Sequence, residues 1–364
     1  GIHKDLVIGF ITRQDQRSRL VCRRDDFPCS ALRAILGDAC AFDLSTFRRI
    51  KCTKRVHKEQ LMTAPNPFQV QAFSTATVIE QERASPNWTV HYQQMSPGHF
   101  AGRIRCLELE GVEIYEETMN TRVEQSFRAP PGALTFCFDR TDNSLYLLNG
   151  ESRNIWITPE NYQEVAVVFG PEFVQRYRVD IARLEGLFMA PLNSMQNALF
   201  SRWLSSTLTR LGQEVDPPSR EALAEQLLQD CLFILDSASV CLDRSALWRR
   251  SEERLIMRRI GQWAGDCPEE TLNLLELAQV AEVPLRQLQQ AFKTYTGMTP
   301  AHWLRLRRLN SARRELLSCK AGDSTVAEVA MHWSFWHLGR FSSSYQQLFK
   351  ELPSETLKRA QRRT

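Results

Sequence analysis

The chain has 364 residues, of which 43% are hydrophobic and 24% are charged, so it can hold two globular domains joined by a linker. It contains no run of about 18 apolar residues, so we expect no membrane-spanning helix. Its ten cysteines form no CxxC or Cys/His cluster, so we expect reduced thiols in a cytoplasmic protein without a metal site or cofactor.

The net charge of +4 conceals a strong asymmetry along the chain. Residues 271–364 carry a net charge of +7 and residues 1–61 carry +6, which leaves −9 for residues 62–270. A basic end attached to an acidic body is typical of a nucleic-acid-binding module fused to a domain with another task.

The first 61 residues differ from the rest of the chain. They hold four of the ten cysteines and no methionine, and they show little periodicity, whereas Met62 opens a stretch typical of a natural start. Two interpretations are open: a basic extension that is disordered or foreign to the native protein, or a genuine basic arm.

Residues 62–190 have the pattern of a β domain. "RIRCLELEGVEIYEETMN" alternates apolar and polar residues, and short β-rich runs are separated by turn formers such as "APPG" and "DRTDNS". Strands of this length and spacing predict a barrel or a sandwich. A pocket for a small ligand needs apolar walls with a few polar groups, and the candidates for such walls are Trp88, His91, Tyr115, Glu116, Phe136, Phe138 and Trp156.

Residues 191–262 change to helical periodicity. Two amphipathic stretches flank "EVDPPS", with Asn193 or Ser194 and then Ser219 as N-caps, and a charged helix follows. We expect a helical linker here, with a dimerisation surface within residues 191–245.

Residues 263–364 contain a helix-turn-helix that occurs twice. "LLELAQVAEV", a break at Glu282–Pro284 and "LRQLQQAFKTYTG" form the first unit, and Gly297 ends its second helix. A helix of about 18 residues, or about 27 Å, follows. "STVAEVAMHW" and "WHLGRFSSSYQQLF" then repeat the unit after 52–53 residues. Two such units could enter successive major-groove faces about 34 Å apart.

These motifs resemble the AraC/XylS transcriptional regulators over Leu274–Leu357. The run "FWHLGRF" with "YQQLF" is most similar to the branch that contains the ethanolamine-utilisation regulator, although Ser334 and Lys350 stand where the family usually has Gly. The resemblance implies an all-α double helix-turn-helix DNA-binding domain. Through "QMSPGHFAGRI" at Gln94–Ile104 it also implies a cupin-like β-barrel sensor, so the expected fold class is α+β.

DNA contacts are expected from the outward faces of the second helix in each unit. Arg286, Gln289 and Gln290 face outward in the first unit, where Arg suits guanine and Gln suits adenine. In the second unit the resemblance implies base contacts by His337, Leu338 and Ser343, with Arg340 beside them and equally suited to phosphate. The phosphate candidates are Lys293, Arg305, Arg307, Ser324, Thr325, Ser342 and Lys350, whereas Arg308 and Arg313 are expected to brace the two units.

The leading hypothesis is a transcriptional regulator, an activator in the first instance, that responds to a small molecule. Its expected partners are double-stranded DNA, an effector, RNA polymerase and a second copy of the chain. The resemblance suggests an amine as effector, with Glu116 as its carboxylate. One alternative is an effector-independent regulator whose β domain only dimerises. The other is an enzyme with a DNA-binding tail, which we do not expect because GxSxG, HExxH, P-loop and dinucleotide motifs are missing.

Overall fold

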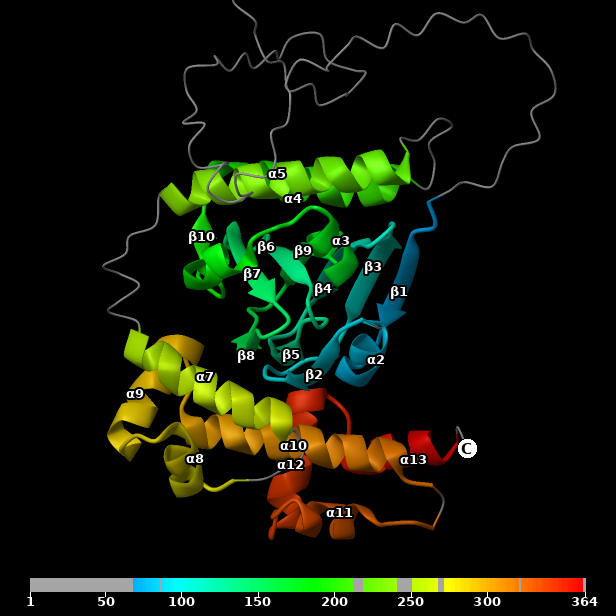
Figure 1. Ribbon diagram of the computed structural model, residues 1–364. Coiled ribbons are helices and arrows are strands. Elements are labelled where there is room, and N and C mark those ends of the chain that lie inside the picture. The colour runs from blue at the N-terminus through cyan, green and yellow to red at the C-terminus, as the bar shows by residue number, and fades with distance from the viewer. Residues whose placement is uncertain are drawn as a thin grey trace, which may run out of the picture.

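The structure is a computed structural model that describes residues 68–85, 87–211, 219–240, 251–267, 272–320 and 322–362 (Figure 1). The segment 1–61, predicted to be a basic extension, lies outside the described residues. Within them the chain begins with a β-sheet domain and ends with a bundle of helices, which confirms the α+β class.

The β-sheet domain consists of two separate antiparallel sheets. One has seven strands in the order β1-β3-β4-β9-β6-β7-β10, and the other has three in the order β2-β5-β8. Among the described strands, no hydrogen-bonded pairing joins the two sheets, so the expected closed barrel is not seen. The strands are β1 (Gln71–Thr75), β2 (Thr89–Gln94), β3 (Gly102–Glu108), β4 (Val112–Met119), β5 (Val123–Arg128), β6 (Leu134–Asp139), β7 (Ser144–Asn149), β8 (Arg153–Ile157), β9 (Tyr162–Phe169) and β10 (Leu192–Asn193).

Both faces of the seven-stranded sheet are covered. One face packs against helices α4 (Met195–Arg210) and α5 (Arg220–Val240), which lie across it in Figure 1. The other face packs toward α2 (Val78–Arg83) and the three-stranded sheet. Shorter helical segments, α3 (Pro171–Arg176) and η3 (Ile181–Leu187), connect β9 to β10. Successive side chains of a strand point to opposite faces, so on β6 Phe136 and Phe138 belong to one apolar cluster and Cys137 belongs to another.

The C-terminal helices surround one long helix. This helix, α10 (Pro300–Ser318), lies between the three-stranded sheet and the shorter helices in Figure 1. One apolar cluster joins these helices and also includes Met95 and Ile155 from the β-sheet domain. The shorter helices are α7 (Ser251–Asp266), α8 (Leu274–Ala281), α9 (Leu285–Thr296), α11 (Val326–His332), α12 (Leu338–Phe349) and α13 (Pro353–Gln361).

Candidate functional site

The first helix-turn-helix unit consists of α8 and α9. Asn273 caps α8 in a capping box with Glu276, and the left-handed Glu282 (φ 55°) ends it before Pro284, as the sequence predicts. The left-handed Gly297 (φ 72°) ends α9. Leu288, Ala291 and Phe292 are buried. The predicted base-contacting residues Arg286, Gln289 and Gln290 are exposed on the opposite face, and so is Lys293.

The second unit, α11 and α12, repeats this arrangement. Phe341, Tyr345, Leu348 and Phe349 form the buried face of α12. The polar residues of "SFWHLGRFSSSYQQLF" lie on the other side. The exposed ones include the predicted base-contacting residues His337, Leu338, Arg340 and Ser343, whereas Ser342 is half-buried.

The two positions that depart from the family's glycines have left-handed backbones. Ser334 has φ 61° in the turn before α12, and Lys350 has φ 59° at its C-cap. Glycine is favoured at such angles because it lacks a Cβ. The turn geometry is therefore kept despite the two substitutions.

The N-terminus of α11 is less open to phosphate than the sequence suggests. The Thr325 hydroxyl accepts a hydrogen bond from the Glu328 amide, while the Glu328 carboxylate accepts from the Thr325 amide. A carboxylate thus already occupies this end of the helix. Ser324, half-buried, lies just before the cap, and Lys350 is exposed at the end of α12.

Helix α10 separates the two units and is braced against the second. Its 19 residues span about 28 Å. The Arg308 guanidinium lies 5.3 Å from the Phe335 ring centroid, and that of Arg313 lies 4.4 Å from the Phe349 ring centroid. Arg313 also forms an ion pair with Glu351. These contacts hold α10 against the second unit, mainly through aromatic rings, whereas the expected bracing of one unit against the other stays a prediction.

Arg307 corrects a prediction. The sequence places it among the phosphate ligands, but its side chain is only 4% exposed and forms an ion pair with Glu124 of β5, which is 0% exposed. The indole of Trp303 donates to the other oxygen of the same carboxylate. Arg307 therefore holds the β-sheet domain, whereas Arg305, on the exposed side of α10, remains available to a phosphate.

Further polar contacts fasten α10 to the three-stranded sheet. The Gln94 amide donates to Asn310 Oδ1 (2.8 Å), and Asn310 Nδ2 donates back to the Gln94 carbonyl (2.9 Å). Arg314 donates to Glu82 and to the Tyr92 carbonyl. These groups are buried or half-buried, and each has a hydrogen-bond partner. The contact between α10 and the β-sheet domain therefore combines apolar packing with directional hydrogen bonds.

The β-sheet domain also contacts the C-terminal ends of both outward-facing helices. Arg122 Nη2 donates to the carbonyl of Thr296, the last residue of α9 (2.8 Å). The Gly98 amide and Gln94 Nε2 donate to the carbonyl of Leu348 near the end of α12, at 2.9 and 3.1 Å. These donors lie close together, because the backbone amide of Met95 donates a hydrogen bond to the backbone carbonyl of Arg122. We call residues 94–98 with Arg122 the docking segment.

A cavity lies between the two sheets, with an empty volume of about 490 Å³ that includes space open to solvent. Trp88, Tyr115 and Trp156, three of the predicted ligand residues, line it. Glu164, which the sequence does not single out, lines it as well. The remaining lining residues are Ser85, Val90, Tyr92, Gln125, Phe127, Cys137, Leu148 and Ala166.

The other predicted ligand residues point elsewhere. Phe136 and Phe138 belong to the apolar cluster under α4 and α5, because they alternate with Cys137 on β6. His91 alternates with the cavity residues Val90 and Tyr92, and burial, followed by the charges of Arg314 and Arg307, lowers its pKa to about 2.

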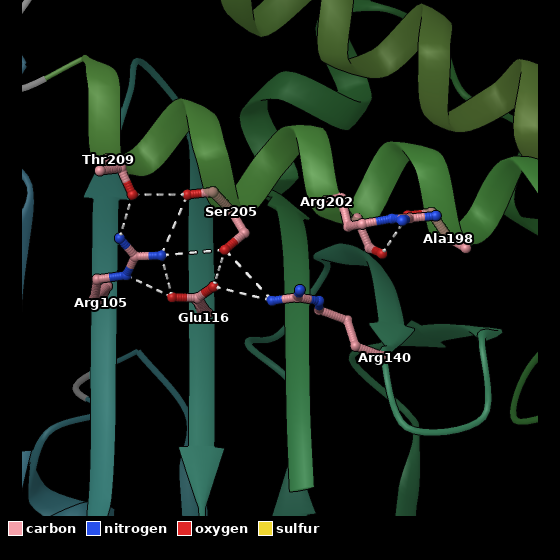
Figure 2. A network of polar contacts seen from close by, with 8 residues as sticks. Arg105, Glu116, Arg140, Ala198, Arg202, Ser205 and Thr209 are labelled. Atoms are coloured by element: carbon pink, nitrogen blue, oxygen red, sulfur yellow. Dashed lines mark hydrogen bonds and ion pairs between the residues drawn. The ribbon is translucent and has the colours of Figure 1, made fainter.

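Glu116 does not line the cavity and instead faces α4, as Figure 2 shows. Its carboxylate pairs with Arg105 and lies 3.6 Å from Arg140, and Ser205 of α4 donates to it. Arg105 also donates to Thr209 Oγ1 (2.8 Å). Because its charge is already balanced, Glu116 fastens α4 to the sheet and cannot serve as the expected amine ligand.

No helix in the part of the chain that the structure describes combines the length and apolar character needed to cross a bilayer. No group of three or more His, Cys, Asp or Glu side chains among the described residues is placed to hold a metal ion.

Comparison with known proteins identifies the C-terminal part. A family described as a helix-turn-helix domain matches residues 277–359. Over 101 residues, 28% of this chain, the sequence is 36% identical to the "XylDLEGF operon transcriptional activator 3" of Pseudomonas putida. Residues 277–359 are a helix-turn-helix domain. The match to the P. putida activator covers 30% of that protein's length.

Two other matches involve the helix-turn-helix domain or extend beyond it. The "Probable thc operon regulatory protein" of Rhodococcus erythropolis is 30% identical over 164 residues, 43% of this chain and 48% of the relative. A solved structure of a probable AraC family transcriptional regulator from Rhodopseudomonas palustris is 29% identical, covering 31% of this chain and 95% of that one, with a TM-score of 0.24. The ethanolamine-regulator branch is not among these findings and stays a prediction.

Three functional positions have little signal in the sequence alone. Glu124, Glu164 and the docking segment matter through partners that are far away in the chain: Glu124 and Arg307 are separated by 183 residues. For Glu124 and Glu164, the signal in the sequence is a carboxylate within a β-rich run, because carboxylates are uncommon in buried strands.

Proposed function

We propose that this protein is a sequence-specific DNA-binding transcriptional regulator, an activator like its Pseudomonas putida relative, whose β-sheet domain controls the helix-turn-helix domain. The observation that carries the proposal is the pair of exposed polar helix faces, on α9 and α12, attached to one long helix. In helix-turn-helix proteins the second helix enters the major groove, and Arg and Gln side chains there pair with base edges.

The docking segment supports control by the β-sheet domain. It contacts α9 and α12 at the same time, through the carbonyls of Thr296 and Leu348. A shift of this segment therefore changes the position of one helix relative to the other. Two sites are coupled when a ligand at one has different affinities for two arrangements of the other.

The cavity is next to the contact between the β-sheet domain and α10. Gln125 lines the cavity, and its neighbour on β5, Glu124, pairs with Arg307 of α10. Tyr92 also lines the cavity, and its backbone carbonyl accepts from Arg314. We propose that an effector in the cavity acts on DNA binding through β2 and β5, which makes this domain the cupin-like sensor that the sequence suggests.

The alternative is a regulator whose β-sheet domain only dimerises. Met195 and Leu199 of α4 are large apolar side chains that are 87% and 58% exposed, which favours a surface for a second copy there. An enzymatic role has no support in the matched domain.

The test is selection of binding sites from random duplex DNA by the full chain, followed by titration of the selected duplex. We expect a bipartite site whose halves lie about one helical turn, 34 Å, apart. Retention of all sequences alike would overturn the proposal of sequence-specific binding.

A further inference from the structure

The cavity between the sheets has an aromatic wall. Five of its lining side chains are aromatic: Trp88, Tyr92, Tyr115, Phe127 and Trp156. Trp88 and Phe127 meet edge to face with ring centroids 6.1 Å apart. Aromatic rings attract cations over their faces, and this attraction is strongest where water is excluded.

Carboxylates on three neighbouring strands lie opposite one another at the floor of the cavity. Glu164 of β9 lines the cavity and lies directly opposite Glu117 of β4 on one side and Asp139 of β6 on the other. Directly opposed residues of an antiparallel pair share a face, so the three carboxylates form a row across the sheet. Like charges placed in this way destabilise the sheet unless something compensates them.

The partners of this row are neutral. Glu117, 0% exposed, accepts hydrogen bonds from Gln81, Tyr92 and Gln125. Glu164 accepts from Tyr162 Oη (2.6 Å) and from Cys137 Sγ (3.0 Å). Among the described residues, no Lys or Arg forms an ion pair with either carboxylate. Without a cation beside them, burial raises the pKa of both carboxyl groups, so a positive charge in the cavity is what would hold them ionised.

A separate observation also points to a ligand. The indole Nε1 of Trp88, which lines the cavity, is buried and has no hydrogen-bond partner among the described residues. Buried donors are nearly always satisfied by protein, water or ligand. A ligand that carries an oxygen acceptor beside its positive charge would satisfy both this donor and the carboxylates.

We propose that the cavity between the two sheets binds a small organic cation, with its ammonium group between the aromatic wall and the Glu164–Glu117 pair and an acceptor oxygen toward Trp88. The site is built from other residues than Glu116, which is balanced by arginines on the far face of the sheet. A metal ion does not fit, because no cluster of metal-binding side chains is found in the described part of the chain. Its role as the effector site rests on the proposed function, whereas the binding itself does not.

The test compares cations with neutral molecules of the same shape, using the full chain. Choline is paired with 3,3-dimethylbutan-1-ol, and 2-phenylethylamine with 2-phenylethanol. Binding is measured by calorimetry and by the shift in Tm, since a ligand that binds the folded state raises Tm. We expect at least one cation to bind roughly tenfold or more tightly than its neutral partner.

Two variants make the assignment specific. Glu164→Gln keeps the shape of the side chain and one acceptor oxygen for Tyr162 and Cys137 but removes the charge, so it should weaken binding of the cation roughly tenfold or more and leave binding of the neutral partner unchanged. Glu160→Gln changes an exposed glutamate of the same domain and should have no effect. The unfolding midpoint of each ligand-free variant shows that it is folded.

The opposite results are equally clear. The cation site would be overturned if the neutral molecules, or the anion 3,3-dimethylbutanoate, bound as tightly as the cations. It would also be overturned if Glu164→Gln left the affinity for the cation unchanged. Such a result, with DNA binding intact in the same preparation, leaves the regulator proposal standing. Cation binding without any sequence-specific DNA binding would instead overturn the regulator and keep the site.

Discussion

The backbone amide of Gly98 donates a hydrogen bond to the backbone carbonyl of Leu348, 2.9 Å away, although the two residues are 250 positions apart in the chain. Gly98 belongs to the β-sheet domain and Leu348 to the last turn of α12. Gln94 reinforces the contact, and Arg122 makes the equivalent contact with Thr296 of α9. A cationic side chain at a helix C-terminus also interacts favourably with the helix dipole.

Arg307→Met tests the join between the two domains. It leaves the fully buried Glu124 without its cationic partner, so we expect the free energy of unfolding to fall by about 3–5 kcal/mol. Urea denaturation followed by tryptophan fluorescence measures the change. Arg305→Met, on the exposed side of the same helix, is the control and should cost less than about 0.5 kcal/mol. Unchanged stability with weakened DNA binding would return Arg307 to the phosphate ligands.

Arg286→Ala tests base recognition by α9. If Arg286 pairs with a guanine, its loss should remove about 1–3 kcal/mol of discrimination at one base position while nonspecific affinity persists. Competition binding with single-base variants of the selected site measures this. Lys293→Ala, two turns further along the same exposed face of α9, should instead weaken binding to every sequence. An equal loss on all sequences for Arg286→Ala would assign Arg286 to a phosphate.

Salt should weaken DNA binding steeply. If four exposed cations each neutralise one phosphate, the slope of log affinity against log salt is about −3.6, or a roughly 150-fold loss between 50 and 200 mM salt. Fluorescence anisotropy over this range measures the slope. A flat response would contradict a basic DNA-binding face. The four cations are Lys293, Arg305, Arg340 and Lys350.

The buried carboxylate row predicts a pH dependence of stability. Burial, and then the facing charge of Glu164, raises the pKa of Glu117 to about 8, against the hydrogen bonds from Gln81, Tyr92 and Gln125. Because the folded-state pKa is above the model value of 4.5, the unfolded chain releases this proton first. The contribution to stability is full below about pH 4.5 and is lost as the pH rises through 8.

Glu117→Gln should therefore flatten the fall in the free energy of unfolding between pH 6 and pH 8. Chemical denaturation at both pH values measures it. Glu160→Gln, exposed in the same domain, is the control and should keep the wild-type slope. A wild-type slope in Glu117→Gln would show that Glu117 titrates normally.

Ser334→Gly should stabilise the turn before α12. Ser334 has φ 61°, an angle that costs a residue with a Cβ about 1–2 kcal/mol, partly offset by the greater freedom of Gly in the unfolded chain. We expect a gain of about 0.5–1 kcal/mol in thermal or urea denaturation. Ser344→Gly, inside α12, should instead be destabilising.

The helix-turn-helix domain could be predicted from the sequence because its signals are local. The apolar spacing of α9, the Gly297 terminus and the Thr299 N-cap each act within a few residues. The departures at Ser334 and Lys350 changed residue types but not the turn angles.

The cavity could be predicted only in part. Alternation on a strand separates two faces, but it cannot say which face holds a pocket when helices cover one side and a second sheet the other. Tyr115 and Glu116 are neighbours, yet only Tyr115 lines the cavity. The opposition of Glu117 and Glu164 depends on strand register, which pairs residues 47 positions apart.

The docking segment holds α9 and α12 through main-chain carbonyls, not through their side chains. Every amino acid supplies the same backbone carbonyl. Substitutions on the outer faces of these helices can therefore alter the preferred DNA sequence while the hydrogen bonds to the docking segment are retained. If the chain is the regulator proposed above, evolution could thereby change its DNA target and leave the contact with the β-sheet domain untouched.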